Sequence, residues 1–585
     1  EMNSISSIVK HVSNSKLKTI RRRFQKLYGA TVADQLLERF YHILGRYGVG
    51  IDAHQTERLW SEKDAVLITY ADMVYQKGEV PLETLRHFCT EHLKGVFSIV
   101  HLLPFYPWSS DDGFSVIDYR EVDERYGDWE HVRSFSGEFD LMFDLVLNHC
   151  SAGSDWFLDY VSGIEPALNY IREEDPEADL TAVVRPRSSP LLTPTSTRDG
   201  ERHAWTTFSS DQVDLDWRSP DLLFEFLDII MKYVSEGSRI LRLDAVAFLW
   251  KEIGTNCLHL PKTHEVVKLL RNFLEVIAPD VIILTETNVP HDENISYFGR
   301  GDEAHMVYQF ALPPLVLHGL LNGTAAHLTE WASHLAPPPR GCSFLNFTAS
   351  HDGIGVRPLE GILSQEEILA LAEKVEARGG LVSMRSLEDG SEVPYELNAT
   401  YFGALAEPED DAVGEARFLC SQAVALAMQG IPAIYFHSLT ATPNHIQGVE
   451  ETGHNRSINR RKWEHGELTE VLDDAECLGA RVFDWLARLL RRRASCPAFH
   501  PDAPQVIKEY GPDLFAVERT SLDGSQTVIC LFNFTNAPVP IPAAIHIEEL
   551  FPDGKFRDFA GGSDITIGPE GVVLRPYQTL WLAPL

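Results

Sequence analysis

Residues 239–248 read RILRLDAVAF, a short apolar run in which Arg242 and Asp244 stand two positions apart. Apolar, β-branched runs of this length between polar stretches are typical of buried strands. Seven similar runs occur along the chain, separated largely by stretches with helical spacing. They are VLITY (66–70), FSIVHLLPF (97–105), DLMFDLVLN (140–148), VIILTETN (281–288), MVYQFALP (306–313), CSFLNFTASHD (342–352) and IPAIYF (431–436). Eight strands alternating with helices predict an α/β fold, a closed (β/α)8 TIM barrel.

The rest of the chain adds elements around this barrel. Residues 1–60 carry apolar positions at helical spacing and predict an N-terminal helical extension before a barrel domain at 61–500. Two long intervals between strands predict inserted subdomains at about 151–218 and 355–410. The final stretch, 501–585, contains alternating runs such as TVICLFNF, which predict a small antiparallel β domain.

The charge balance excludes some classes of function. The 585 residues include 51 basic and 85 acidic side chains, for a formal charge of −34. Such a surface repels nucleic acid and anionic membranes, so neither is an expected partner. Two basic clusters, at 16–26 and 488–493, interleave with apolar residues at helical spacing, and we interpret them as solvated helix faces.

The cysteines and the absence of long apolar segments bear on the cellular compartment of the protein. Eight cysteines are scattered without a C-x-x-C pair, which favours reduced thiols over a disulfide framework. No run of 18 apolar residues and no signal-peptide pattern occurs in the sequence. These features predict a cytoplasmic protein.

Polar side chains gather where the predicted strands end. In a TIM barrel the carboxyl ends of the strands meet at one rim, which is where the active site is built. A single aspartate in such a place is often a helix cap, but acids at the ends of the fourth, fifth and seventh strands together are not explained by capping. The residues are Asp144, Asn148 and His149, then Arg242 and Asp244, then Glu286, and finally His351 and Asp352.

Carboxylates brought together in this way suit glycoside chemistry. One carboxylate attacks the anomeric carbon while a second protonates the departing oxygen. Arg242 projects from the same face of its strand as Asp244, two residues later, and would keep that carboxylate ionised. The sequence therefore predicts a glycoside-active enzyme.

Four motifs resemble those of glycoside hydrolase family 13, the α-amylase family. They are D-x-x-x-N-H (144–149), RLDAV (242–246), the glutamate of LTETN (Glu286) and SHD (350–352). The resemblance implies that Asp244 is the nucleophile, Glu286 the general acid and base, and Asp352 a carboxylate that stabilises the transition state. It also implies that His149, Arg242 and His351 line the glucose subsite.

Further motifs resemble the sucrose phosphorylase subfamily. HLLPF (101–105), DDGFSVIDY (111–119), PKTH (261–264) and SHDGIGV (350–356) are the most telling, and together with the N-terminal extension they look most like the glucosylglycerate phosphorylases. This implies retaining phosphorolysis of 2-O-α-D-glucosylglycerate to α-D-glucose 1-phosphate and D-glycerate. The alternatives are sucrose or sucrose 6′-phosphate phosphorylase, an α-glucoside hydrolase or transglucosidase, and a non-catalytic amylase-like interaction domain.

The same resemblance implies further binding residues. Asp111 and Arg460 would bind glucosyl hydroxyls, although a turn and a surface ion pair are the plain structural alternatives. Arg187, in R-P-R, would meet phosphate through its guanidinium, unless it is merely solvated. A glycerate carboxylate needs a cation of its own, and three arginines remain open for that role: Arg202, Arg357 and Arg456.

No cofactor or metal is expected. The motifs H-x-x-x-H, C-x-x-C and the EF-hand spacing are absent, and only Asn148, which corresponds to a calcium ligand of some amylases, leaves a question. The expected partners are a small-molecule glucoside and inorganic phosphate. The sequence leaves open whether the protein is a monomer or a homodimer.

Overall fold

Eight parallel strands form a closed barrel at the centre of the molecule. The computed structural model describes residues 12–47, 59–387, 389–541, 554–566 and 572–584. Each strand pairs with the barrel strands that precede and follow it in the sequence, and the last pairs with the first. All eight predicted strands are confirmed. They are β1 (Val66–Thr69), β3 (Ile99–Leu102), β4 (Asp140–Val146), β9 (Ser238–Asp244), β10 (Ile282–Thr285), β11 (Met306–Tyr308), β12 (Ser343–Asn346) and β16 (Ile431–Tyr435).

The helices that follow these strands begin where their sequences favour a start. Helix α7 (Pro220–Ser235) and helix α8 (Pro261–Ile277) both have proline at the first position, where its missing N–H costs nothing. Ser219 also caps α7 through its hydroxyl. Both helices bury a wide apolar face against the barrel.

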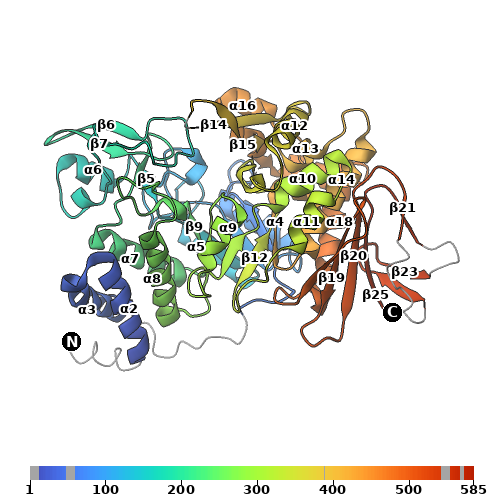
Figure 1. Ribbon diagram of the computed structural model, residues 1–585, viewed down its shortest axis with the longest axis horizontal. Helices are drawn as coiled ribbons and strands as arrows, with labels where there is room; N and C mark the ends of the chain where they lie inside the picture. Colours follow the sequence, from blue (N-terminus) through green and yellow to red (C-terminus); the bar gives the residue numbers. More distant parts are fainter. Residues whose placement is uncertain (1–11, 48–58, 388, 542–553, 567–571, 585) are drawn as a thin grey trace.

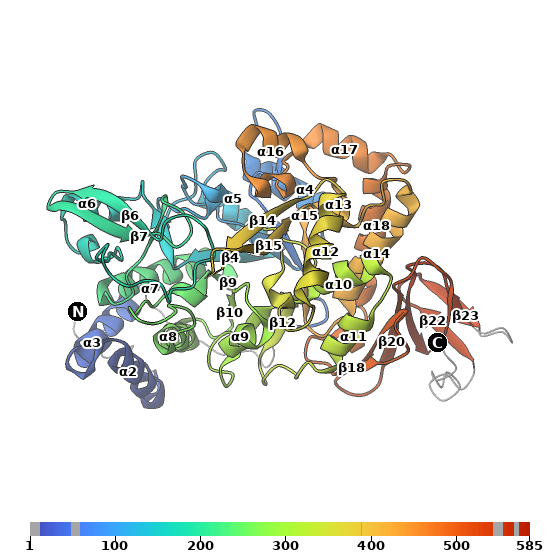
Figure 2. The same ribbon diagram turned by 45° about the horizontal axis from the view of Figure 1, so that its top comes forward.

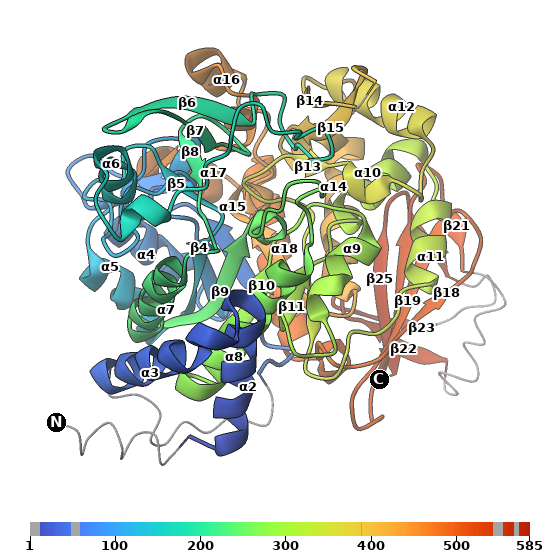
Figure 3. The ribbon, with the colours of Figure 1, turned by 60° about the vertical axis from the view of Figure 1, so that its left-hand side comes forward.

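Two N-terminal helices, α2 (Asn14–Tyr28) and α3 (Ala30–Tyr47), lie against α7 and α8 (Figures 1 and 3). Phe24 stacks on Phe224 with ring centroids 6.0 Å apart, and Phe40 meets Phe273 edge-on at 5.8 Å. These residues fall within the predicted helical extension, of which residues 1–11 and 48–58 lie outside the described chain. The extension is thus packed on the outside of the barrel.

The basic face of α2 is part of this contact. Arg23 and Lys26 both place a nitrogen 3.1 Å from the Glu265 carboxylate of α8. The interpretation of residues 16–26 as a solvated face is therefore wrong for Arg23, whose side chain is 13% exposed, but it holds for Lys26, which is 51% exposed. Sequence periodicity cannot reveal an acidic partner on another helix.

Two insertions rise over the carboxyl ends of the strands (Figure 2). In the first, β6 (Leu192–Thr197) and β7 (Gly200–Trp205) form a hairpin, and β8 (Gln212–Asp214) pairs with β5 (His149–Ser151). In the second, β13 (Ile354–Gly355), β15 (Glu392–Asn398) and β14 (Leu381–Ser386) form a small antiparallel sheet beside α12 (Gln365–Glu376). Ser364 and Glu367 form a capping box that starts α12.

A six-stranded antiparallel sheet forms the C-terminal part of the chain and lies at the opposite end of the molecule from α2 and α3 (Figure 1). Its strand order is β18 (Gln505–Lys508), β19 (Leu514–Thr520), β20 (Thr527–Asn533), β25 (Thr579–Pro584), β22 (Lys555–Asp558) and β23 (Ser563–Thr566). This confirms the expected β domain. No helix among the described segments combines the length and apolarity needed to cross a membrane.

Two buried arginines hold the C-terminal part of the chain to the barrel, Arg519 from the sheet and Arg493 from the helix that precedes it. Arg493, at the end of α18 (Leu478–Ala494), donates hydrogen bonds to the carbonyls of Leu426, Gly430 and Phe499 at 2.9, 3.1 and 3.2 Å. Arg519 donates to the carbonyls of Ala427 and His500, both at 2.9 Å. Burial lowers the pKa of Arg493 to about 9, and the charge of Arg519 adds to this effect. Arg493 is therefore not on the solvated face that the 488–493 cluster suggested.

Candidate active site

The carboxylate of Asp244 is held at the end of β9 by an arginine two residues earlier. Arg242 Nη1 donates to Asp244 Oδ1 at 2.8 Å and to Asp144 Oδ1 at 2.6 Å. His101 lies behind them, with Nε2 2.6 Å from Asp144 Oδ2. Burial raises the pKa of Asp244 above its ordinary value, and Arg242 opposes this shift and favours the ionised form.

A strained turn joins Asp244 to the next acid. Ala245 adopts a left-handed conformation (φ 50°), which is uncommon for a residue with a side chain. This turn directs the Ala245 N–H to Glu286 Oε2, at 3.0 Å. Burial raises the pKa of Glu286 to about 7, and Asp244 and Asp352 add to the shift while Arg242 opposes it. Glu286 is therefore placed to release and regain a proton near neutral pH.

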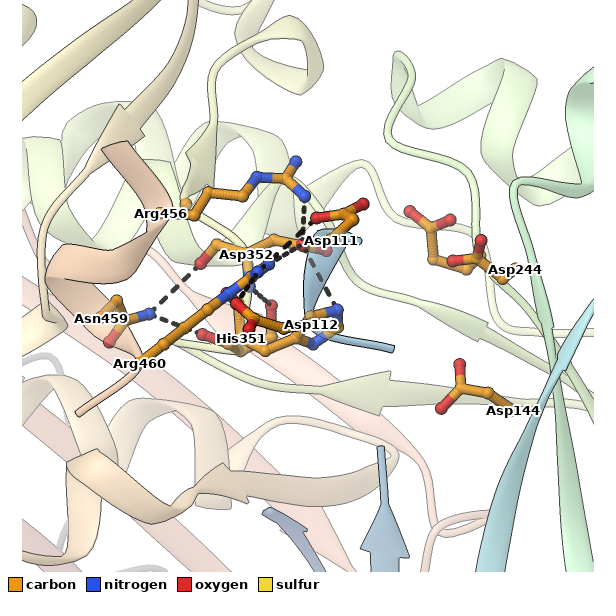
Figure 4. A network of polar contacts seen from close by, with 12 residues as sticks. Asp111, Asp112, Asp144, Asp244, His351, Asp352, Arg456, Asn459 and Arg460 are labelled. Carbon is orange, nitrogen blue, oxygen red and sulfur yellow. Dashed lines mark hydrogen bonds and ion pairs between the residues drawn. The ribbon is translucent and has the colours of Figure 1, made fainter. Parts of the chain in front are cut away.

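Two arginines surround the third acid, as Figure 4 shows, while Asp244 stands apart from this cluster. Arg456 Nη1 lies 2.8 Å from Asp352 Oδ1, and Arg460 Nη2 lies 3.6 Å from it. Burial alone would raise the pKa of Asp352, but Arg456, His351 and Arg460 lower it well below its ordinary value. Asp352 is thus a permanent negative charge facing an acid that can be neutral.

The segment Asp111–Gly113 forms a tight turn beside the same cluster. Asp111 and Asp112 both have positive φ, and Gly113 has a φ of 110°. A Cβ on Gly113 would lie 2.6 Å from the Pro104 carbonyl oxygen, so only glycine fits there. Arg460 Nη1 donates to Asp112 Oδ2 at 2.8 Å and lies 3.6 Å from Asp111 Oδ1.

The two predicted histidines flank a phenylalanine. His351 stacks on Phe114 with centroids 4.9 Å apart and planes within 6°. His149 Nε2 lies 2.8 Å from the Phe114 carbonyl oxygen, to which it donates. Burial holds the pKa of His351 well below its ordinary value, so the ring is neutral. His351 therefore supplies an uncharged polar edge to the site, and His149 lines the same site on the other side of Phe114.

A deep cavity joins these groups. Most of the predicted residues line it, but Arg242 and Arg460 lie behind its wall, with their guanidinium groups occupied by Asp144, Asp244 and Asp112. The charged lining residues are Asp111, Asp244, Glu286, Asp352, Glu396, Arg187, Arg357 and Arg456, and the phenylalanine and tyrosine rings are Phe114, Phe208, Phe248, Phe310, Phe347, Tyr395 and Tyr401. Acids and aromatic rings in one cavity are suited to a sugar ring that is polar at its edge and apolar on its faces.

Arg187 enters this cavity from the first insertion. Its guanidinium carbon lies 5.4 Å from the Phe208 ring centre and 5.5 Å from that of Tyr395. Nη1 donates to the Pro186 carbonyl at 3.2 Å. In contrast, Arg202 is half exposed and pairs with Glu173 outside the cavity.

A lysine lies against Asn148, the residue that raised the question of calcium. Lys251 Nζ donates to Asn148 Oδ1 at 3.1 Å and to the Phe248 carbonyl at 2.6 Å, and pairs with Asp214 Oδ2 at 3.0 Å. Its side chain is 2% exposed. The described residues contain no group of three or more metal-ligating side chains. The Lys251 ammonium group thus links Asp214 of the first insertion to Asn148 at the end of a barrel strand.

This arrangement leads to a test of stability. We expect Lys251→Met to lower the free energy of unfolding by about 3–5 kcal/mol, because Asp214 would be left buried without a cation. Urea unfolding followed by circular dichroism measures the change, and Lys232→Met, which removes a more exposed pair with Glu236, is the control. EDTA should leave the midpoint of the unmodified protein unchanged. Equal stability of the two variants would contradict this role for Lys251.

Sequence reasoning missed several polar residues of the cavity, of which Glu396 and Gln212 contact predicted site residues. Glu396, in β15, accepts from Arg456 Nε and Nη2 at 3.0 and 2.8 Å. Gln212, in β8, reaches Asp111 Oδ2 at 3.2 Å. Both lie on insertions, where no motif singles them out. For Glu396 there was one signal, its position as a charged residue within the alternating stretch YELN (395–398).

Comparison with known proteins gives a consistent result. The family model of the alpha amylase catalytic domain matches residues 92–330. The glucosylglycerate phosphorylase of Spirochaeta thermophila is 47% identical over 528 residues, which cover 89% of this chain and 90% of that protein. The glucosylglycerate phosphorylase of Escherichia coli is 43% identical over 560 residues, covering 95% and 98%.

A solved structure extends the comparison to the fold. The crystal structure of sucrose 6F-phosphate phosphorylase from Thermoanaerobacter thermosaccharolyticum matches with a TM-score of 0.70 and 25% sequence identity. The match covers 81% of this chain and 94% of that protein.

Proposed function

Because this chain belongs to the α-amylase family, and within it to the branch of the glucosylglycerate phosphorylases, we propose that it converts 2-O-α-D-glucosylglycerate and phosphate into α-D-glucose 1-phosphate and D-glycerate. The observation that carries the proposal is the cavity in which Asp244, Glu286 and Asp352 face one another beside arginines from the inserted loops. The reaction retains the anomeric configuration through two displacements.

In the first displacement Asp244 attacks the anomeric carbon. A bond forms between its carboxylate oxygen and C1 as the bond from C1 to the glycerate oxygen breaks, and Glu286 gives its proton to that oxygen. The raised pKa of Glu286, about 7, supports this role because the residue is substantially protonated at neutral pH. The product of this step is a β-glucosyl ester of Asp244 and free glycerate.

In the second displacement a phosphate oxygen attacks C1 from the opposite face and the ester bond breaks. Glu286 then accepts a proton from phosphate where one is present. Its change of role has an electrostatic cause, because the negative charge of Asp244 contributes to the raised pKa of Glu286 and disappears when the ester forms. The pKa of Glu286 therefore falls once the ester has formed, so the residue is more readily ionised at the moment when a base is needed.

The remaining residues hold the sugar and the anion. Asp352, ionised by Arg456 and its neighbours, would stabilise positive charge on the glucosyl ring in the transition state. Asp111, His149 and His351 line the cavity and would bind the glucosyl hydroxyls. Arg242 and Arg460 act through the carboxylates that they position, and Arg187 would bind phosphate.

The proposal also covers the conditions in which the enzyme works. All eight cysteines are free and seven of them are buried, which suits the reducing cytoplasm. The chemistry is complete with side chains and phosphate, so we infer that no cofactor is needed.

The proposal predicts a phosphate-dependent reaction. Incubation with 2-O-α-glucosylglycerate should release α-glucose 1-phosphate only when phosphate is present, whereas sucrose should give little product. A coupled assay for glucose 1-phosphate measures the rate. Release of free glucose at the same rate without phosphate would mean a hydrolase, and a preference for sucrose would overturn the acceptor while leaving the mechanism.

A further inference from the structure

Two arginines of the cavity, Arg187 and Arg357, have no carboxylate within hydrogen-bonding distance among the described residues. Among the arginines open for the acceptor, Arg456 is fully engaged, because its guanidinium donates to both oxygens of Glu396 and pairs with Asp352. Arg202 lies outside the cavity. Arg357 alone of these three lines the cavity without a close carboxylate.

The surroundings of Arg357 leave it available to a ligand. Its Nε lies 3.8 Å from Glu360 Oε1, but that same oxygen accepts a hydrogen bond from Arg385 Nη2 at 2.7 Å. Glu360 is therefore matched to Arg385. The Arg357 Nε is shielded from solvent and has no hydrogen-bond partner among the described residues. A buried donor without a partner is costly unless a bound molecule meets it.

An unmatched acceptor lies on the same wall. Asn288 lines the cavity, and its buried Oδ1 has no hydrogen-bond partner in the described part of the chain. Its side chain packs on the backbone of Gly355, where a Cβ would lie 2.2 Å from the amide nitrogen. Gly355 precedes Arg357 by two residues. The loop after β12 and the loop after β10 thus present a cationic donor and an amide acceptor together.

We propose that Arg357 binds the carboxylate of the glycerate unit and that Asn288 Oδ1 accepts a hydrogen bond from its free hydroxyl. This assignment rests on the proposed function and identifies its acceptor subsite. Glycerate carries both groups that the wall requires, a carboxylate for the cation and a hydroxyl donor for the amide oxygen. A phosphate ion at neutral pH also carries acceptor oxygens and a P–OH donor, so the second measurement below separates the two anions. Arg187, on the other insertion, remains for phosphate.

The test uses the reverse reaction, in which acceptors compete. The full-length enzyme receives α-glucose 1-phosphate with equal concentrations of glycerate and glycerol, and the ratio of the two glucosides is measured. Glycerol offers hydroxyls without a carboxylate. We expect Arg357→Gln to lower the preference for glycerate by about 10- to 100-fold, the usual cost of a hydrogen bond to a charged group. Arg357→Lys should recover part of the preference, and Arg202→Gln, outside the cavity, should keep all of it.

A second measurement separates glycerate from phosphate. The Arg357→Gln variant should use phosphate as acceptor from α-glucosyl fluoride with nearly the kcat/KM of the unmodified enzyme, which also shows that it is folded. An equal loss with phosphate, or an unchanged ratio of glucosides, would overturn the assignment. If the unmodified enzyme does not use glycerate as an acceptor, the proposed function itself is overturned. The reaction of the unmodified enzyme shows this before any variant is made.

Discussion

Asp244→Asn should remove nearly all glucosyl transfer, with kcat lowered by roughly 10⁴-fold or more, as found when a covalent nucleophile is replaced. The amide cannot form the glucosyl ester, although it still accepts a hydrogen bond from Arg242, so the strand end stays in place. Phosphate-dependent release of α-glucose 1-phosphate measures the effect. Asp140→Asn, at the other end of a barrel strand and largely exposed, is the matched control and should lose less than twofold.

A chemical rescue distinguishes the nucleophile from the other acids. With the smaller Asp244→Ala side chain, azide should attack α-glucosyl fluoride from the vacated face and give the β-glucosyl azide. If Asp244 only positioned another nucleophile, azide would give the α-anomer or no product. The configuration of the azide therefore decides the role of Asp244 independently of how far the rate falls.

Glu286→Gln should lower kcat/KM for glucosylglycerate by about 10²- to 10⁴-fold, the usual contribution of a positioned acid. Glycerate is a poor leaving group without a proton, whereas fluoride leaves unassisted. The first step with α-glucosyl fluoride should therefore be nearly unaffected, which stopped-flow detection of fluoride release measures. Equal losses with both donors would mean that Glu286 does not protonate the leaving group.

The pH profile gives a further check on Glu286. Since burial raises its pKa to about 7, the acid form dominates below that pH and is lost above it. For the unmodified enzyme, kcat/KM for glucosylglycerate should fall as the pH rises through about 7, and this limb should be missing for Glu286→Gln. The α-glucosyl fluoride reaction should lack the limb in both proteins.

The sequence predicts the barrel and its acids well because both depend on local patterns. Each strand is a separate apolar run, and parallel strands bring their ends to one rim whatever the loops do. Asp244, Glu286 and Asp352 could therefore be placed together without knowing any contact between them. The fold gives their mutual orientation, as with the turn at Ala245 that connects two of them.

Contacts between loops could not be predicted in the same way. The pairing of Arg456 with Glu396 joins residues 60 positions apart, one of them in a strand of the second insertion, and that pairing removes Arg456 as a free cation. The match of Glu360 with Arg385, which leaves Arg357 available, is of the same kind. The role of Lys251 could not be predicted from the sequence, because its buried partners Asn148 and Asp214 come together only in three dimensions.

The two buried arginines at the base of the barrel divide the molecule into regions of different tolerance to sequence change. Arg493 also donates to the Glu62 carbonyl just before β1, so it joins α18 to the beginnings of β1 and β16. Arg519 joins the C-terminal sheet to the end of the helix before β16, and both lie far from the rim that carries the acids. The attachment of the C-terminal part of the chain thus depends on the base of the barrel, whereas the chemistry depends on the rim. Substitutions in the rim loops can alter which acceptor is used while the base maintains the fold, and substitutions around Arg493 can change heat resistance without altering which acceptor is used.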